Sequence, residues 1–94
     1  MTAAAVGDIA VIDDQSVVVL STPRTQRASS RALVVPLTNA AVDGDPWAVP
    51  TEVGWARVAF LATVATSRLS GAQGSLSSVE YRAVRVRVAR FTAA

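Results

Sequence analysis

The chain has 94 residues, of which 51% are apolar and 5% aromatic, and its nine basic and seven acidic residues leave a formal net charge of +2. It contains neither Cys nor His, which excludes disulfides, thiolate zinc sites and a serine–histidine nucleophile pair. This length suits one small domain with a core mainly of Val, Ala and Leu, and such a core leaves apolar surface that dimerisation would cover.

The first predicted elements are two strands joined by a tight turn. Residues 7–12 (GDIAVI) alternate weakly between polar and apolar, and residues 16–21 (SVVVLS) form a β-branched run. Asp13 and Asp14 between them are turn-prone. We therefore expect a β-hairpin, and turn chemistry explains the two acids better than a metal site does.

The next connection carries Arg24, Arg27 and Arg31 and no acidic residue. Pro23 breaks the preceding strand, so we expect a loop that leads into a third strand at residues 31–38 (RALVVPLT). Three like charges repel one another, which favours a negatively charged partner. The alternative is a solubilising surface loop.

The middle of the chain alternates further strands with turns. Pro36 favours an edge or a bulge in the third strand. Beyond it we expect a loop at residues 39–46 and strands at residues 47–53 and 55–64, with a turn at Gly54. Residues 66–75 (TSRLSGAQGS) are too rich in Gly and Ser for a strand and hold at most one helical turn.

The last segment, residues 77–91 (SSVEYRAVRVRVARF), fits a strand period in part and a helix period in part. Ser77 and Glu80 have the spacing of a capping box. Apolar side chains recur at helical spacing, at Tyr81, Val84, Val88 and Phe91. We therefore expect a helix that packs this stripe on a sheet, with its arginines as a solvated surface.

The positive charge is concentrated in the second half of the chain. Residues 1–47 carry three Arg and five Asp (net −2), and residues 48–94 carry six Arg and two Glu (net +4). Arg suits phosphate through its planar guanidinium.

The start has no basic and apolar leader pattern, and the longest apolar stretch, residues 58–65, is far shorter than the ~20 residues of a membrane helix. We expect a soluble, cytoplasmic, single domain over residues 1–94, with a flexible tail at residues 1–6.

The order and spacing of these motifs resemble the MazF/PemK toxins, relatives of CcdB. The family commonly shows a Trp near the start of its fifth strand, a Thr-Val pair before Ser-Arg-Leu, then Gly-x-Leu-Ser and a Glu that opens the helix. The matching residues here are Trp55, Thr63-Val64, Ser67-Arg68-Leu69, Gly74-Ser75-Leu76-Ser77 and Glu80. The resemblance implies a mainly β fold, an SH3-like small barrel of about five strands with a C-terminal helix.

The resemblance also implies a function. Members of the family are homodimeric toxins of type II toxin–antitoxin pairs, and they act as endoribonucleases on single-stranded RNA. They use the 2′-hydroxyl of the RNA as the nucleophile, without metal or cofactor. The partner implied beside RNA is an antitoxin whose disordered, acidic tail folds into the basic groove.

The family pattern assigns candidate site residues. Thr38, at the end of the third strand, matches the catalytic Thr, and Ser21 matches a small polar position beside the same groove. The chemistry needs a positive group and hydrogen-bond donors around the phosphate. Gln15 and Ser16, however, stand where the family has Arg-Pro, so the catalytic position diverges and activity is expected to be reduced or lost.

The arginine connection offers a replacement for that missing charge. We predict that Arg24, Arg27 and Arg31 contact RNA, together with Ser21 and Gln15. Two alternatives stay open: a catalytically inactive protein that binds RNA or antitoxin only, and a CcdB-like gyrase inhibitor.

The aromatic residues have two interpretations. Trp47 and Trp55 could stack on bases, but packing in the core or a dimer interface is favoured, more so for Trp55. Tyr81 is assigned to the core by its helical register.

Overall fold

The computed structural model describes residues 4–40 and 44–93. This part of the chain contains seven strands, two α-helices and two 3₁₀ turns. They are β1 (Asp8–Ile12), β2 (Gln15–Val19), α1 (Pro23–Ser29), β3 (Arg31–Thr38), β4 (Ala48–Thr51), β5 (Gly54–Arg57), η1 (Val58–Phe60), β6 (Ala62–Ala65), η2 (Thr66–Arg68), β7 (Ser70–Ser75) and α2 (Ser78–Ala93). The prediction of a mainly β fold with a C-terminal helix is confirmed.

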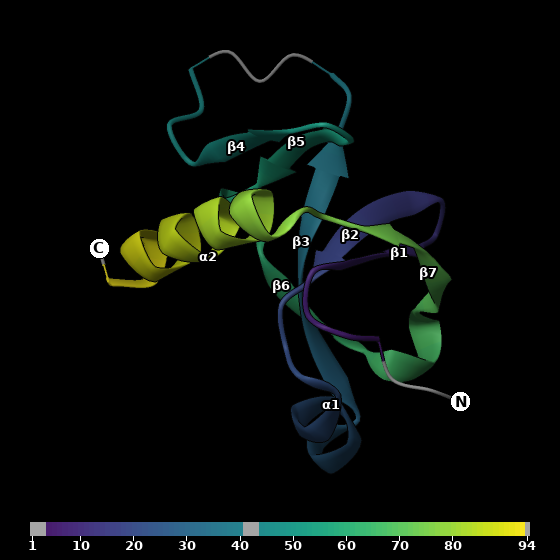
Figure 1. The fold of residues 1–94 in the computed structure, drawn as a ribbon. Helices are drawn as coiled ribbons and strands as arrows, with labels where there is room; N and C mark the ends of the chain where they lie inside the picture. Colours follow the sequence, from purple (N-terminus) through teal and green to yellow (C-terminus); the bar gives the residue numbers. More distant parts are fainter. Residues whose placement is uncertain (1–3, 41–43, 94) are drawn as a thin grey trace.

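The strands form one antiparallel sheet in the order β4-β5-β3-β2-β1-β7, and β6 also pairs with β3. The sheet is not closed into a barrel. Figure 1 shows β3 as the long central strand, with α1 at its start and β4 and β5 near its arrowhead. Pro36 lies between the part of β3 that pairs with β6 (residues 31–34) and the part that pairs with β5 (residues 37–38). Because Pro36 lies between these two paired parts, its missing amide proton removes no hydrogen bond to β5 or β6.

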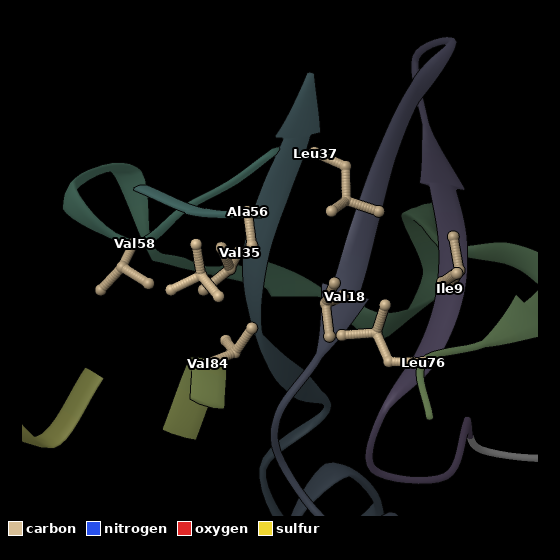
Figure 2. Packing of buried hydrophobic residues seen from close by; sticks show 9 residues of the cluster. Ile9, Val18, Val35, Leu37, Ala56, Val58, Leu76 and Val84 are labelled. Carbon is tan, nitrogen blue, oxygen red and sulfur yellow. The ribbon is translucent and has the colours of Figure 1, made fainter. Parts of the chain in front are cut away.

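The central strands bury both of their faces. Val18 and Val35 pack with Val84 of α2 on one face (Figure 2). Their neighbours Val17 and Val34 belong to a second cluster on the opposite face. Strands buried on both faces read as continuous apolar runs, which explains why β2 and β3 do not alternate.

The hairpin of β1 and β2 is formed as predicted. Asp13 and Asp14 connect the strands, and both have positive φ, 48° and 65°. Type I′ hairpin turns need positive φ at both central residues, which Asp tolerates better than most residues do.

The arginine connection is a helix, not a loop. Thr22 caps α1, because its Oγ1 accepts a hydrogen bond from the Thr25 amide at 3.2 Å, and Pro23 occupies the first turn. The helix stops at Ser30, which has φ 58°. Pro23 does end the preceding strand, but proline directly after a capping Thr is also a helix-start signal, and this second role decides the structure here.

Two predictions for residues 55–75 are also wrong. Residues 55–64 do not form one strand, because η1 separates β5 from β6, and the two strands pair with different parts of β3. Residues 70–75 do form a strand, β7, which pairs with β1 although all its side chains are exposed. Backbone pairing with β1 outweighs its low strand propensity.

The C-terminal helix follows the sequence closely. Ser77 Oγ accepts from the Glu80 amide at 3.2 Å and donates to Glu80 Oε1 at 3.3 Å, so the Ser77 half of the predicted capping box is formed. The other carboxylate oxygen, Glu80 Oε2, accepts from the Glu52 amide at 2.6 Å. Val84 is fully buried, and the other three residues of the predicted stripe, Tyr81, Val88 and Phe91, pack against the same core. In the described residues, neither helix has the length and apolar character needed to cross a membrane.

The expected flexible tail lies partly outside the described residues. Residues 1–3 are not described. The Ala4 carbonyl accepts from Gln26 Nε2 at 2.7 Å, and the Ala5 amide donates to Asp8 Oδ2 at 2.8 Å.

Candidate functional site

Four residues form a row across the sheet at the end of β3. Thr38 lies opposite Trp55 of β5, and Trp55 lies opposite Pro50 of β4. Val17 of β2 pairs with Pro36, so the same register places Gln15 opposite Thr38. We call Gln15, Thr38, Trp55 and Pro50 the cross-strand row.

The cross-strand row faces away from α2. Leu37 and Ala56, which neighbour Thr38 and Trp55 along their strands, are buried in the core under α2. Because successive side chains of a strand alternate between faces, Thr38 and Trp55 point to the opposite, outer face. Gln15 and Pro50 are exposed, Thr38 is half-buried, and Trp55 is 36% exposed.

The hydrogen bonds of the row leave a neutral, polar site. The Thr38 Oγ1 atom accepts from the Ala40 amide at 3.1 Å and donates to none of the described residues. Gln15 Nε2 donates to the Leu37 carbonyl and to the Ser16 carbonyl, the latter at 3.0 Å. The row thus presents a hydroxyl and an amide beside each other, without a charged member.

Two arginines near the row each lie close to one acid. Arg57, two residues beyond Trp55 on β5, lies 3.6 Å from Asp45 and stacks over the Phe60 ring at 4.2 Å. Arg68 forms an ion pair with Asp13 in the β1–β2 turn. Each charge is therefore partly neutralised where it stands.

The other predicted site residues gather at the opposite end of β3. Arg24 and Arg27 lie on α1, are exposed, and form no ion pair with the described acids. Arg31 starts β3 and donates to the Thr63 carbonyl at 3.0 Å. Ser21 precedes α1, and its Oγ accepts from the Leu33 amide at 3.1 Å. We call this set the α1 cluster.

The structure therefore divides the predicted site in two. It brings Gln15 next to Thr38 at the end of β3, and Ser21 next to the arginines at its start. The two groups therefore lie at opposite ends of β3, a strand that can be followed in Figure 1. Seven residue steps along a strand span about 23 Å. Within one chain, the arginines of the α1 cluster do not reach Thr38.

Neither the burial of Gln26 nor the exposure of Trp55 was predicted from the sequence. Gln26 is 2% exposed, and its Nε2 donates to the Ala4 and Ser21 carbonyls at 2.7 and 2.9 Å. Trp55 is exposed in the single chain and therefore does not pack in its core, whereas packing in a dimer interface stays a prediction. Trp47 packs against the core as predicted. The alternation of Trp55, Ala56 and Arg57 was the signal that could have revealed an outward-facing Trp.

The described residues contain no cluster of three acidic side chains that could hold a metal ion. A shallow hollow of about 290 Å³ lies on the α2 side of the sheet, lined by Pro46, Trp47, Arg87 and Arg90. It is separate from the cross-strand row.

Solved structures share this fold over nearly their whole length. A mycobacterial endoribonuclease is 16% identical, covers 99% of this chain and 94% of its own, and superposes with a TM-score of 0.87. A MazE–MazF complex from Deinococcus radiodurans is 15% identical over 97% of both chains, with a TM-score of 0.84. A mycobacterial endoribonuclease in complex with its cognate antitoxin is 17% identical over 99% of this chain and 96% of its own, with a TM-score of 0.78.

No family model matches the sequence, and no curated protein does. The solved structures establish the architecture: the chain has the fold of the MazF toxins, as the sequence resemblance predicted.

Proposed function

We propose that the protein is a MazF-like toxin of a type II toxin–antitoxin pair and acts on single-stranded RNA. The observation that carries the proposal is the fold shared along almost the full length with an endoribonuclease and with a MazE–MazF complex. The open end of β3, with Thr38 beside Gln15, is a suitable place for an RNA phosphate. The proposed location is the cytoplasm.

The chemistry of the cross-strand row predicts slow cleavage. In the proposed reaction the 2′-hydroxyl attacks the adjacent phosphorus, the bond to the 5′-oxygen breaks, and a cyclic phosphate forms. The 2′-hydroxyl proton is lost to water, and the 5′-oxygen takes one from water. The Thr38 hydroxyl can donate to a phosphate oxygen. Both N–H groups of the Gln15 amide are held by backbone carbonyls, so this amide donates to phosphate only after it releases one of them. Neither carries a charge, so stabilisation of the dianionic transition state is weaker than with an arginine.

The α1 cluster is assigned to phosphate binding. Its three arginines form a positive patch without a described acidic partner, and such patches dominate affinity for nucleic acid. The patch can approach Thr38 only from a second copy of the chain, because about 23 Å exceeds the reach of a side chain. A homodimer with a shared site is therefore part of the proposal, as is an acidic antitoxin segment that competes with RNA.

Controlled expression in bacteria tests the function. We expect growth arrest and discrete new 5′ ends in transcripts mapped by primer extension, both suppressed by Thr38→Ala. Arrest with trapped gyrase–DNA complexes and no new RNA ends would instead support a gyrase inhibitor.

A second candidate is a protein that binds RNA or antitoxin without cleavage. The neutral cross-strand row favours it, since Arg57 and Arg68 are paired with acids and Gln15 stands beside Thr38. In that case, RNA would stay intact after long incubation with a saturating amount of protein, although it is bound.

A further inference from the structure

The two tryptophans of the chain have opposite environments. Trp47 packs against the core, with its ring edge-on to Phe91 at a centroid distance of 5.1 Å. Trp55 lies in the cross-strand row on the outer face, 36% exposed. Burial in the core thus explains Trp47 and leaves Trp55 unexplained.

We propose that Trp55 is a base-stacking residue, which holds the base of the nucleotide whose phosphate contacts Thr38. The inference rests on the proposed function and adds to it a residue that binds a base rather than a phosphate. Aromatic side chains on an open sheet surface are common platforms for single-stranded nucleic acid, because every base has a flat face.

The register supports this placement. Directly opposed residues of antiparallel strands have Cβ atoms about 5 Å apart, so the side chains of Trp55 and Thr38 start side by side. Pro50 flanks it on the other side. A nucleotide that contacts Thr38 through its phosphate therefore has its base within reach of the Trp55 ring.

The backbone also fixes Trp55 firmly. Gly54 precedes it with φ 127°, and a Cβ at this position would lie 2.8 Å from the Thr38 carbonyl oxygen. Only glycine allows β5 to approach Thr38 so closely. Ala56, the next residue, is fully buried. A platform held in this way loses little conformational freedom when it binds a base.

Stacking has a characteristic specificity. It tolerates every base but is stronger for larger ring systems, so preferences are modest and arise without hydrogen-bond readout. We expect Trp55 to favour a purine at one nucleotide position and to have no influence on the others.

Binding of a 2′-O-methyl oligoribonucleotide, which lacks the attacking hydroxyl, tests the proposal. In Trp47→Phe protein, where Trp55 is the only Trp, RNA should quench the fluorescence. Trp55→Ala should weaken binding about tenfold, and Trp55→Phe should weaken it less. Oligoribonucleotides that lack one base at a time should identify a single position. Loss of that base should weaken RNA binding by the parent protein but not by Trp55→Ala.

Each other outcome overturns the inference in a recognisable way. If Trp55→Ala binds like the parent and retains the parent's near-UV circular dichroism, Trp55 does not stack, and the proposed function stands. If Trp55 fluorescence responds to protein dilution and not to RNA, a second copy covers the ring. If the parent binds no RNA and expression produces no new transcript ends, both this inference and the proposed function fail.

Discussion

The two ends of β3 differ in the kind of residue they present. The cross-strand row offers a hydroxyl, an amide and an indole, and the nearby Arg57 and Arg68 each lie close to one acid. The α1 cluster, about 23 Å away along the strand, offers guanidinium groups and a hydroxyl that is already bonded to backbone. One end has the groups that could orient a phosphate, and the other has the charge that could attract it.

This separation bears on the hypothesis that Gln15 stands in the place of a family arginine. The sequence suggested that a neighbouring loop had taken over its charge, but the loop is a helix at the other end of the strand. Compensation within one chain is excluded by distance. Any charge that the α1 cluster supplies to Thr38 would therefore have to come from a second copy of the chain.

The largest effect is expected when charge is added to the neutral end. Gln15→Arg places a guanidinium beside Thr38, and one well-placed stabiliser of the transition state changes the rate by about a hundredfold or more. We expect single-turnover cleavage of single-stranded RNA to rise by that factor.

The matched control is Gln73→Arg, the same change at an exposed position of β7. It should leave the rate unchanged, and Gln15→Arg combined with Thr38→Ala should lose the gain. Tighter binding without faster cleavage in Gln15→Arg would show that Thr38 does not mark a catalytic position.

The next effect concerns the packing of the α1 end. Gln26→Leu keeps most of the side-chain volume but leaves the Ala4 and Ser21 carbonyls without their donor. Buried groups that lose a partner destabilise by about 1–3 kcal/mol, and these two bonds are only part-buried. The variant also removes Gln26 Oε1, a buried atom without a hydrogen-bond partner in the described residues, so we expect the free energy of unfolding in urea to fall by about 1 kcal/mol. Gln73→Leu on the exposed β7 should change it by less than about 0.5 kcal/mol. Equal effects of the two variants would mean that Gln26 does not anchor α1.

The α1 cluster should control the salt dependence of RNA binding. Replacing Arg24 and Arg27 by Ala removes up to two phosphate contacts, each worth about 0.7 in the slope of log affinity against log salt for a single strand. We expect the slope to fall by about 1.4 and the affinity at low salt to fall roughly tenfold. Arg82→Ala with Arg85→Ala changes the charge equally on exposed α2 positions and should leave the slope unchanged. An unchanged slope in the first variant removes α1 from the RNA site.

A mixture of variants tests whether two chains share the site. Thr38→Ala protein lacks the hydroxyl, and the variant without Arg24 and Arg27 lacks the charge. If one active site takes Thr38 from one chain and the α1 arginines from the other, a mixed dimer of the two variants has one intact site. Subunit exchange should then restore part of the cleavage activity that each variant lacks alone. No recovery, despite demonstrated subunit exchange, contradicts a shared site.

The fold could largely be predicted because its strands are dense apolar runs. The runs in β2 and β3 bury both faces, and the Ser77–Glu80 box with the stripe through Val84 defines α2. The errors fall where tertiary pairing outweighs local preference. β7 is a strand only because β1 offers it hydrogen bonds, and η1 separates β5 from β6 because the two strands pair with different parts of β3.

The candidate site was harder to predict, because proximity along the chain differs from proximity in the sheet. Ser21, Arg24 and Arg31 are close in sequence and remain close in space, whereas Thr38 is only seven positions beyond Arg31 and lies at the far end of the strand. Gln15 reaches Thr38 through strand register, which sequence alone does not fix. The exposure of Trp55 could be predicted only if one knew which face of the sheet α2 covers.

The smallest effect compares the stability of the two helices, α1 and α2. Thr22 caps α1 and Ser77 caps α2, and the loss of either cap destabilises its helix by about 1 kcal/mol. α1 has seven residues and is too short to persist without its neighbours, so Thr22→Ala should let it open locally. Amide hydrogen exchange in α1 should then accelerate about fivefold, without a change in the urea midpoint. Ser77→Ala should lower the midpoint for the whole protein, because Val84 of α2 lies in the core. A shifted midpoint in Thr22→Ala would make α1 part of the cooperative core, and its arginines would then be held as rigidly as the cross-strand row.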